Sequence, residues 1–281
     1  MTQTIASVLQ DAYQQLLMTS ESPHLDAEVL LAHVLQEPRS HLFAFPEREL
    51  TDDVVIFFKK RIEERHQKIP IAYITGHQEF WSLDLRVTKD TLIPRPETEL
   101  LVELVLKWVA GKNQIIADLG TGSGAIALAL AHEQPTWTLH ATDISASALQ
   151  VAKLNAERLH LSNVIFHQGS WCEPLPKINY AAIVSNPPYI ASGDLFLEQG
   201  DLVREPESAL IADENGLGDL RRIIIQSREY LCSNGYLLLE HGFQQASDVR
   251  KIFAEWGYND VNSYQDLAGL DRVTYGKIKS C

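Results

Sequence analysis

The stretch that decides the fold is Ile115-Ile116-Ala117-Asp118-Leu119-Gly120-Thr121-Gly122-Ser123-Gly124, followed directly by Ala125-Ile126-Ala127-Leu128. A short apolar run leads into a glycine-rich turn and then into an apolar segment, a pattern that predicts strand, turn and helix. Glycines allow a tight turn and let a ligand approach the backbone, and a helix start offers unpaired N–H groups. We therefore expect a ligand to bind at this turn.

Strands and helices alternate regularly after this turn. The pattern predicts strands at 115–119, 137–142, 163–167, 180–185 and 235–240, helices at 123–133, 145–160, 217–231 and 243–256, and two more strands near 260–264 and 272–278. Such alternation is typical of an α/β fold with a mostly parallel sheet covered on both faces. Residues 190–216 show little periodicity, and a loop of that length is usually functional or mobile.

The chain before this region predicts a small helical bundle. Helical periodicity indicates helices from Thr4 to about Met18, from Ser22-Pro23 onward, and from Thr51-Asp52 to about Gln67. In the third helix we expect the apolar positions to face the bundle core rather than a ligand, namely Val54, Val55, Phe57, Phe58 and Ile62.

The segment between the bundle and the alternating region reads as a connection. Alternation over 76–91 predicts strands or a hairpin, and Leu92 to Glu99 leads into a helix through Ala110. The Pro94-Arg95-Pro96 stretch is open to two interpretations, a helix entry or a rigid loop beside an active site. We expect a helical domain at 1–72, a β-hairpin linker at 73–92 and an α/β domain at 93–281.

Composition narrows the class of protein. The formal net charge is −13, and residues 1–80 hold 7 Lys and Arg against 12 Asp and Glu, so neither half has the basic balance of a domain that grips nucleic acid. The N-terminus lacks a secretory signal, and no apolar stretch is long enough to span a membrane. Three scattered cysteines, Cys172, Cys232 and Cys281, argue for a reducing, cytoplasmic compartment and against a zinc site.

A carboxylate follows the second strand of the alternating region. Ala141-Thr142-Asp143 comes about twenty residues after the glycine turn, the spacing at which nucleotide-binding folds place an acid on ribose hydroxyls. Asp143 can also serve as a helix cap for the segment that starts at Ser145. Because the glycine turn lies upstream, we favour ribose binding.

The second candidate site is Asn186-Pro187-Pro188-Tyr189, which follows the apolar strand Ala181-Ala182-Ile183-Val184-Ser185. Two adjacent prolines stiffen the peptide and remove two backbone donors. An amide carbonyl, a proline carbonyl and an aromatic face are thus held at the carboxyl end of a strand, where α/β sheets bind ligands. This group offers acceptors and a stacking plane without an acid, a base or a nucleophile. It suits a planar NH₂ group that is presented to an external electrophile.

The first motif resembles that of class I S-adenosylmethionine-dependent methyltransferases, with Asp118 ahead of Gly120, Gly122 and Gly124. The resemblance implies a Rossmann-like, seven-stranded sheet and cofactor contacts from Asp118, the turn Gly120-Thr121-Gly122-Ser123-Gly124, Asp143 and Asn186. It places the adenine near Gly169-Ser170-Trp171. Many relatives carry Asp where Ser170 stands, so the contact expected here is stacking or packing by Trp171.

Asn186-Pro187-Pro188-Tyr189 in turn resembles the motif of enzymes that methylate planar nitrogens, in adenine or in glutamine. Such a nitrogen is a weak nucleophile. Acceptance of its two hydrogens by the Asn186 side chain and the Pro187 carbonyl favours pyramidalisation, while Tyr189 packs against the flat group. We therefore expect Asn186, Pro187 and Tyr189 to be catalytic through positioning and electrostatics, and these three with Pro188 to bind the substrate.

Taken in order along the whole chain, several motifs are similar to those of the PrmC/HemK family: the helical N-terminal domain, Phe80-Trp81, Ile93-Pro94-Arg95-Pro96-Glu97-Thr98-Glu99, the glycine turn, Asn186-Pro187-Pro188-Tyr189, Glu205-Pro206 and Glu240-His241-Gly242. Members methylate N5 of the glutamine in the Gly-Gly-Gln loop of class I peptide chain release factors. The resemblance implies S-adenosylmethionine as cofactor, S-adenosylhomocysteine as product, a release factor docked on the helical domain, and 190–210 beside the glutamine pocket. It favours an active-site place for Arg95 and leaves Glu240-His241 either structural or lining the site. The alternatives are an N6-adenine methyltransferase and a non-enzymatic binding module.

Overall fold

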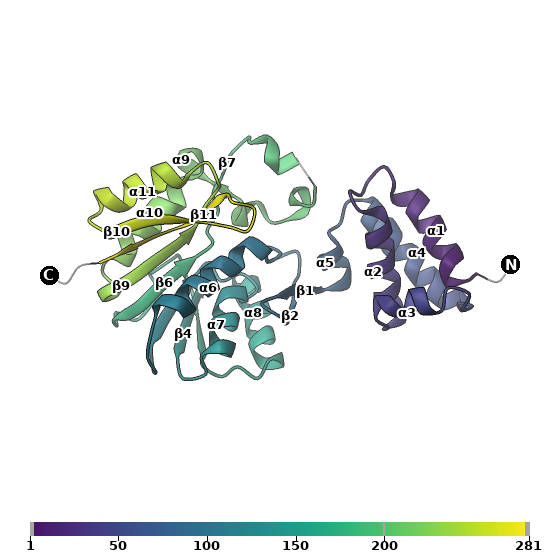
Figure 1. Cartoon of the computed structure of the whole chain (residues 1–281), viewed down its shortest axis with the longest axis horizontal. Helices are drawn as coiled ribbons and strands as arrows, with labels where there is room; N and C mark the ends of the chain where they lie inside the picture. Colours follow the sequence, from purple (N-terminus) through teal and green to yellow (C-terminus); the bar gives the residue numbers. More distant parts are fainter. Residues whose placement is uncertain (1–2, 199, 279–281) are drawn as a thin grey trace. The chain divides into compact units, whose positions relative to one another are not determined.

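The computed structural model describes residues 3–198 and 200–278 of the 281. It divides into two compact units, one formed by Met1–His77 with Leu195–Arg204 and the other by Gln78–Asp194 with Glu205–Cys281. Figure 1 follows the chain from its helical start into the α/β unit. Of the three cysteines, Cys281 lies outside the described residues.

The helical unit contains the three expected helices and two that the sequence did not predict. Helices α1 (Ile5–Leu16), α2 (Pro23–Leu35) and α4 (Asp52–His66) match the prediction, and α1 begins at a capping box formed by Thr4 and Ser7. Helices α3 (Arg39–Ala44) and α5 (Ile71–Thr75) are too short to show a periodic apolar pattern.

The core of this unit corrects one prediction. On α4 the residues Val55, Phe58 and Ile62 are buried, as expected, and Val54 is half-buried. Phe57, however, is 58% exposed, so its assignment to the core is wrong. Successive helical residues are rotated by about 100°, and the packed stripe through Phe58 turns its neighbour outward.

A distant segment belongs to the same unit. Leu195–Arg204, with 3₁₀ turns η2 (Leu195–Glu198) and η3 (Leu202–Arg204), groups with the helices, whereas the sequence-based division placed it in the α/β domain. The buried Arg65 explains the difference: Nε donates to Asp26 Oδ2 and Nη1 donates to Asp201 Oδ1, both at 2.6 Å. No local sequence pattern announces a pair so far apart along the chain.

The predicted hairpin is present as β1 (His77–Phe80) and β2 (Leu83–Arg86). Trp81 and Ser82 between them have φ values of 53° and 59°, the left-handed pair of a tight two-residue hairpin turn. Phe80, Leu83 and Leu85 are buried on one side. The hairpin therefore folds onto an apolar core.

The α/β unit is built on a seven-stranded sheet of order β10-β11-β9-β6-β3-β4-β5. All neighbours are parallel except β11, which runs antiparallel to both β9 and β10. This is the mostly parallel, Rossmann-like, seven-stranded sheet that the sequence resemblance implied. The strands are β3 (Ile115–Leu119), β4 (Thr138–Asp143), β5 (Val164–Gln168), β6 (Tyr180–Ser185), β9 (Leu231–Glu240), β10 (Asn259–Gln265) and β11 (Asp271–Lys277).

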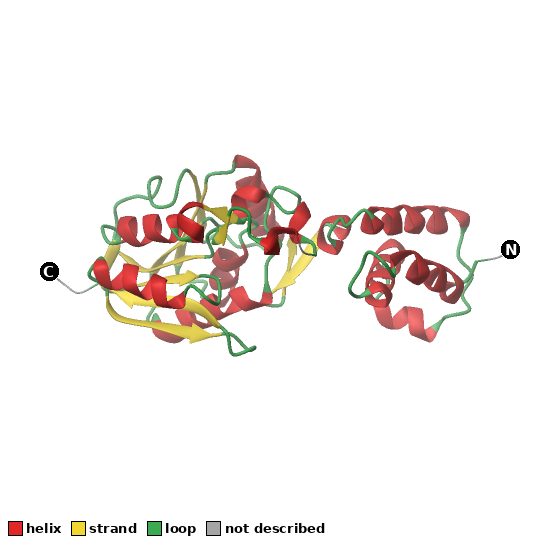
Figure 2. Cartoon of the chain, turned by 90° about the horizontal axis from the view of Figure 1, so that it is seen from above, coloured by secondary structure: helices red, strands yellow, loops and turns green. Residues whose placement is uncertain are grey.

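Helices cover both faces of this sheet, as Figure 2 shows. One apolar cluster packs the sheet against α6 (Glu99–Trp108), α7 (Ala125–Glu133) and α8 (Ala146–Arg158). The other packs it against α10 (Gly218–Ser227) and α11 (Ala246–Glu255). In β3, Ile116 joins the first cluster while Ala117 and Leu119 join the second, so this strand is buried on both faces.

Short elements fill the rest of the α/β unit. The 3₁₀ turn η1 (Pro96–Thr98) precedes α6, and the aperiodic region after β6 contains β7 (Ile190–Ala191), η4 (Glu207–Ala209), β8 (Ile211–Ala212) and α9 (Asp213–Gly216). β9 begins at Leu231, earlier than predicted, because the preceding helix already ends at Ser227. Within the described part of the chain, no helix is both long and apolar enough to cross a membrane.

Candidate active site

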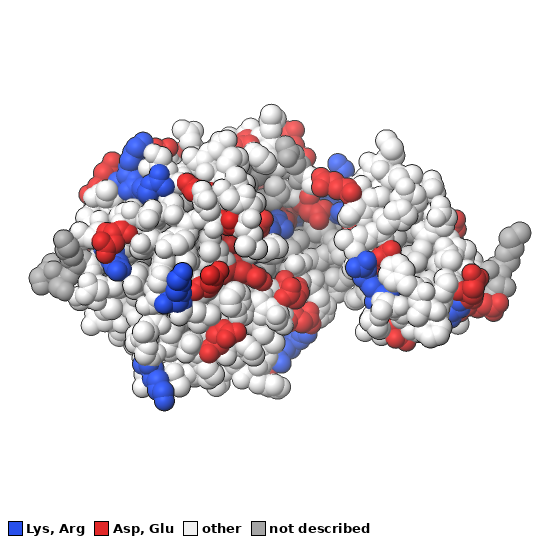
Figure 3. Space-filling view, in the orientation of Figure 1, with Lys and Arg blue, Asp and Glu red and all other residues white. Residues whose placement is uncertain are grey.

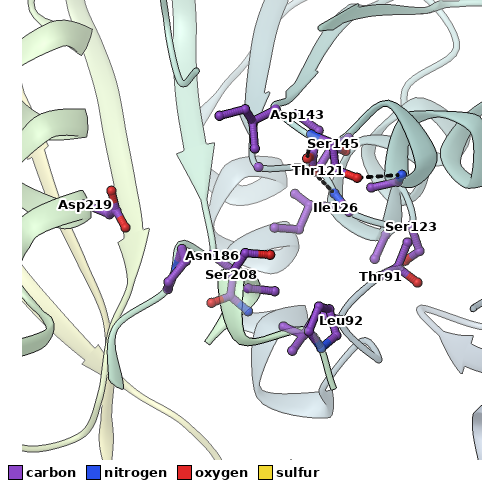
Figure 4. Close-up of a pocket in the computed structure, with 18 of the residues that line it drawn as sticks. Thr91, Leu92, Thr121, Ser123, Ile126, Asp143, Ser145, Asn186, Ser208 and Asp219 are labelled. Carbon is purple, nitrogen blue, oxygen red and sulfur yellow. Dashed lines mark hydrogen bonds between the residues drawn. The ribbon is translucent and has the colours of Figure 1, made fainter. Parts of the chain in front are cut away.

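A cavity of about 380 Å³ opens at the carboxyl ends of the parallel strands. Its wall combines the glycine turn, the ends of three strands, the 3₁₀ turn η4 with Pro206 before it, and the start of α10. Figure 4 shows Asp143 and Ser145 toward one end and Asn186, Ser208 and Leu92 toward the other. The lining includes Thr91, Leu92, Thr98, Gly120, Thr121, Gly122, Ser123, Asp143, Ser170, Trp171, Asn186, Pro188, Ser208, Asp219 and Arg222.

The turn after β3 requires its glycines. Gly120, Gly122 and Gly124 all have positive φ, at 69°, 56° and 90°. A Cβ at Gly124 would lie 2.8 Å from Leu128 Cδ1, and one at Gly120 would lie 3.1 Å from the Trp171 ring. The turn is therefore folded tightly between α7 and the loop after β5, with Gly120 to Ser123 on the cavity wall.

Asp118 shapes this turn from behind. Its Oδ2 accepts from the Thr121 hydroxyl at 2.6 Å and from the Ala127 N–H at 3.1 Å, while Oδ1 has no partner among the described residues. Complete burial raises the pKa of the Asp118 carboxyl to about 7, against the lowering effect of both hydrogen bonds. The cavity lining does not include Asp118, so the geometry gives it the task of holding the turn and the start of α7.

Asp143 lies on the cavity wall at the end of β4. Its Oδ2 accepts from the Gly122 N–H at 2.9 Å and its Oδ1 from the Ser145 N–H at 2.8 Å. The side chain that caps α8 is that of Ser145, which accepts from the Ala148 N–H. Burial raises the pKa of Asp143, and these backbone donors oppose the rise. The carboxylate has about four acceptor positions and these donors do not use them all, so a hydroxyl in the cavity can still donate to it.

Trp171 is fixed at the far wall. Its φ of 46° is left-handed, and its carbonyl accepts from the Thr142 hydroxyl at 3.0 Å. Its indole also favours the charged form of the nearby Asp219 carboxylate. The ring lies against Gly120 and, together with Ser170, lines the cavity where a planar group can pack.

Asn186 and Pro188 reach the cavity from the end of β6, whereas Pro187 between them is buried. The Asn186 Nδ2 donates to the Thr98 hydroxyl oxygen at 3.0 Å. Because the amide nitrogen is used in this way, Oδ1 is left as the acceptor of the side chain. The sequence analysis quoted Thr98 as part of a motif without assigning it a role.

Tyr189 points its hydroxyl away from solvent, donating to Glu240 Oε1 at 3.2 Å. Burial raises the pKa of the phenol, and the neighbouring carboxylate adds to the rise. Glu240 is 1% exposed, and burial raises the pKa of its carboxyl to about 7. The next residue, His241, takes another direction: Nδ1 donates to the Gly242 carbonyl and Nε2 meets the Thr274 hydroxyl. The two residues whose place the sequence left ambiguous thus have different surroundings. Glu240 faces the Asn186 loop, and His241 is held by the Gly242 backbone and by Thr274 on β11.

Arg95 is held by a residue from the aperiodic region that follows β6. Its guanidinium forms an ion pair with Glu205, whose side chain is fully buried. Glu205 Oε2 also accepts from the Ile93 N–H at 3.0 Å. This carboxylate therefore joins the Ile93-Pro94-Arg95 stretch to Pro206, both of which border the cavity through Pro94 and Pro206.

The structure thus brings the glycine turn, Asp143, Trp171, Asn186 and Pro188 to one cavity, with Asp118 and Tyr189 behind its wall. Sequence reasoning missed Thr91, Thr98, Ser208, Asp219 and Arg222 as lining residues. The run Ile93 to Glu99 carried a usable signal, since a rigid Pro-Arg-Pro entry was one interpretation. Asp219 and Arg222 lie on an ordinary amphipathic helix, where nothing separates them from surface charges.

Comparisons with known proteins agree with this arrangement. Two family models match, the "PrmC N-terminal domain" over residues 7–76 and the "Methyltransferase small domain" over residues 96–213. A methyltransferase structure from Pyrococcus furiosus superposes with a TM-score of 0.55 at 18% identity, covering 79% of this chain and 98% of that one. This likeness supports the fold.

Curated relatives match over nearly the full length of the chain. The release factor glutamine methyltransferase of Aliivibrio fischeri is 47% identical over 279 residues, covering 99% of this chain and 98% of the relative. The protein of the same name from Escherichia coli is 46% identical over 269 residues, covering 96% and 97%.

Proposed function

This chain belongs to the release factor glutamine methyltransferase family, and we propose that it methylates N5 of the glutamine in the Gly-Gly-Gln loop of class I peptide chain release factors. The observation that carries the proposal is the hydrogen bond from Asn186 Nδ2 to Thr98, because it leaves the amide oxygen to accept from a substrate NH₂ group. The methyl donor is S-adenosylmethionine and the product is S-adenosylhomocysteine.

The cavity fits such a cofactor in chemistry. Asp143 offers carboxylate lone pairs to the ribose hydroxyls, and the turn Gly120 to Ser123 lets a ligand approach its backbone. Trp171 offers a face for the adenine, a contact that does not need an acid at Ser170. Asp118 supports the site indirectly, through Thr121 and Ala127. When bound, S-adenosylmethionine supplies an electrophilic methyl group.

The residues of the chain contribute positioning rather than acid–base chemistry. The Asn186 side-chain oxygen and the Pro187 carbonyl accept the two hydrogens of the glutamine amide, which directs the nitrogen lone pair toward the donor. Pro188 lines the same cavity, whereas Tyr189, which was predicted to pack against the flat amide, lies behind the wall and supports the loop through its hydrogen bond to Glu240. No base is needed before transfer, since the methylated amide loses its proton readily afterwards. Electrostatic stabilisation by fixed acceptors is the main catalytic contribution.

The partner we propose is the release factor, docked with help from the helical unit, in the cytoplasm. The competing function is methylation of N6 of adenine in DNA or RNA, which shares the Asn186 chemistry but needs a basic surface. Figure 3 shows acidic and basic side chains interspersed on the face in view, without a broad basic area. The net charge of −13 points the same way.

Labelled S-adenosylmethionine tests the proposal directly. The protein is incubated with a release factor, with the same factor carrying alanine in place of the Gly-Gly-Gln glutamine, and with DNA. We expect label on the first substrate only and a mass gain of one methyl group on that glutamine. Label on DNA with none on the release factor would establish the adenine reaction, and no label on any substrate would favour a binding module.

A further inference from the structure

We propose that Thr98 and Glu240 are positioning residues which together determine the direction in which the Asn186 carboxamide faces. The inference deepens the proposed function and rests on it, because the direction matters only if Asn186 accepts from a substrate amide. Its basis is a row of neighbouring polar groups behind the cavity wall, drawn from η1, the loop after β6 and the end of β9.

The first link joins Asn186 to Thr98. Asn186 is half-buried at the cavity, and Thr98 is 4% exposed. At 3.0 Å the two side chains are in hydrogen-bond contact. A hydroxyl both donates and accepts, so contact with Thr98 alone satisfies the carboxamide through its nitrogen or through its oxygen. A further group must decide between the two.

Glu240 is that group. An ionised carboxylate only accepts, so a hydroxyl beside it must donate to it. Oε1 accepts from Tyr189, no described residue completes a well-formed hydrogen bond to Oε2, and the Thr98 hydroxyl interacts with the carboxyl as a donor that stabilises its charged form. Thr98 has one hydrogen. Once that hydrogen faces Glu240, only a lone pair remains for Asn186, which must then present its NH₂ group.

The consequence reaches the cavity. With Nδ2 turned to Thr98, the Asn186 oxygen is the atom left for a substrate NH₂ group. If the hydrogen of Thr98 were free, the hydroxyl could donate to the Asn186 oxygen, and the carboxamide could turn its NH₂ group to the substrate. In that orientation the NH₂ group of Asn186 would face the NH₂ group of the substrate, and neither could accept from the other. The carboxylate of Glu240 thus selects the productive orientation without touching the substrate.

Several groups face Glu240 and set its charge. Tyr189 hydrogen-bonds to it, the Thr98 hydroxyl and Arg272 on β11 favour the carboxylate, and Glu97 on η1 opposes it. Burial is the largest influence and raises the pKa to about 7. As pH rises through this value Glu240 becomes ionised, so turnover is expected to rise over the same range.

Three variants test the proposal with a release factor as substrate. Thr98→Val keeps the shape and removes the hydroxyl, Thr98→Ser keeps the hydroxyl, and Glu240→Gln replaces the carboxylate with an amide that can donate to Thr98. We expect kcat to fall by about 10- to 100-fold in Thr98→Val and Glu240→Gln, the scale of a misplaced catalytic contact, and to stay within about threefold in Thr98→Ser. The dissociation constant of S-adenosylmethionine, measured by calorimetry, should change by less than about threefold in all three.

A matched control separates positioning from loss of a buried hydroxyl. Thr274 is fully buried and hydrogen-bonded to His241 and Ser263 rather than to Asn186 or Glu240, so Thr274→Val should leave kcat near the wild-type value. The pH profile of kcat supplies the second readout. In the wild type kcat should rise with pH in a limb near pH 7, and this limb should be missing in Glu240→Gln.

Two results would overturn the inference. One is unchanged kcat in Thr98→Val with cofactor binding intact, and the other is a limb near pH 7 that persists in Glu240→Gln. Failure of the proposed function looks different, because the wild-type protein would then leave the release factor unlabelled while still binding the cofactor.

Discussion

The two turns that form the cavity are held in place by different means. The turn at 118–124 is fixed from within its own neighbourhood: Asp118 binds Thr121 and Ala127, and three glycines supply the backbone conformations. The turn at 186–189 is fixed from a distance, by Thr98 in front of α6 and Glu240 at the end of β9. Both rely on a fully buried carboxyl whose pKa is raised to about 7.

The difference matches the task of each turn. A cofactor site must offer a fixed shape, which a short stretch of chain can provide alone. A site that orients a weakly nucleophilic amide must fix the direction of one hydrogen-bond acceptor, and this takes groups from several elements. Local and distant support should therefore fail in different ways when they are disturbed.

The largest effect is expected at the distant-support turn. Asn186→Ala removes an acceptor that is most useful in the transition state, so kcat should fall by about 10²–10³-fold. Cofactor affinity, measured by calorimetry, should fall much less. The surface variant Asn262→Ala is the matched control, and equal losses of kcat and cofactor affinity in Asn186→Ala would assign Asn186 to cofactor binding instead.

The next effect belongs to the cofactor end of the cavity. Asp143→Asn removes the charge that strengthens hydrogen bonds to ribose hydroxyls, so the dissociation constant of S-adenosylmethionine should rise by about 10- to 100-fold. Turnover at saturating cofactor should change little. The exposed Asp248→Asn on α11 carries the same charge change as a control. Unchanged affinity in Asp143→Asn would leave Asp143 with only its backbone hydrogen bonds.

A pair of glycine variants measures how tightly the locally supported turn is packed. Both Gly122→Ala and Gly124→Ala force a residue into positive φ, at a cost of about 1–2 kcal/mol. A Cβ at Gly122 meets nothing within 4 Å, whereas one at Gly124 meets Leu128 at 2.8 Å and Ala152 at 3.3 Å. Gly124→Ala should therefore lower the free energy of unfolding by about 1–3 kcal/mol more than Gly122→Ala in urea titrations. Equal losses would show that backbone conformation alone requires Gly124.

The smallest effect is a pH dependence of stability. Burial raises the pKa of Asp118 to about 7 in the folded protein, whereas the unfolded chain releases this proton near the ordinary aspartate pKa of 3.8. The contribution of this group is therefore complete below about pH 4 and is lost as pH rises through 7. In urea titrations between pH 5 and 7.5, the wild type should lose on the order of 1–2 kcal/mol relative to Asp118→Asn. Parallel curves for the two proteins would mean that Asp118 is ionised throughout this range.

Much of the fold could be predicted from the sequence because its signals are local. The run Ile115 to Gly124, with the apolar residues that follow it, predicts strand, turn and helix from consecutive residues. The neighbouring strands and helices likewise show the apolar alternation or helical periodicity of their type. The error at Phe57 arose because this apolar residue lies next to the buried residue Phe58. An apolar residue at the edge of a helix's buried face fits the periodic pattern whether it is buried or exposed. The short helices α3 and α5 hold too few residues to show any period.

The site divides in the same way. Asp143, Trp171 and Asn186 were identified because each follows a predicted strand, and parallel strands end at one edge. Thr98, Asp219 and Arg222 reach the same cavity from helices and a 3₁₀ turn, where the direction of a side chain depends on packing. The contact between Asn186 and Thr98 joins residues 88 positions apart, which a single sequence does not reveal.

The grouping of Leu195–Arg204 with the helices has a consequence for how this protein can change in evolution. The polypeptide passes between the two units three times, after His77, after Asp194 and after Arg204. A gene that lost its first 77 codons would leave the loop Leu195–Arg204 without the Arg65 side chain that pairs with its Asp201. The helical unit therefore cannot be removed as one continuous piece of sequence, and the two units are expected to be inherited together.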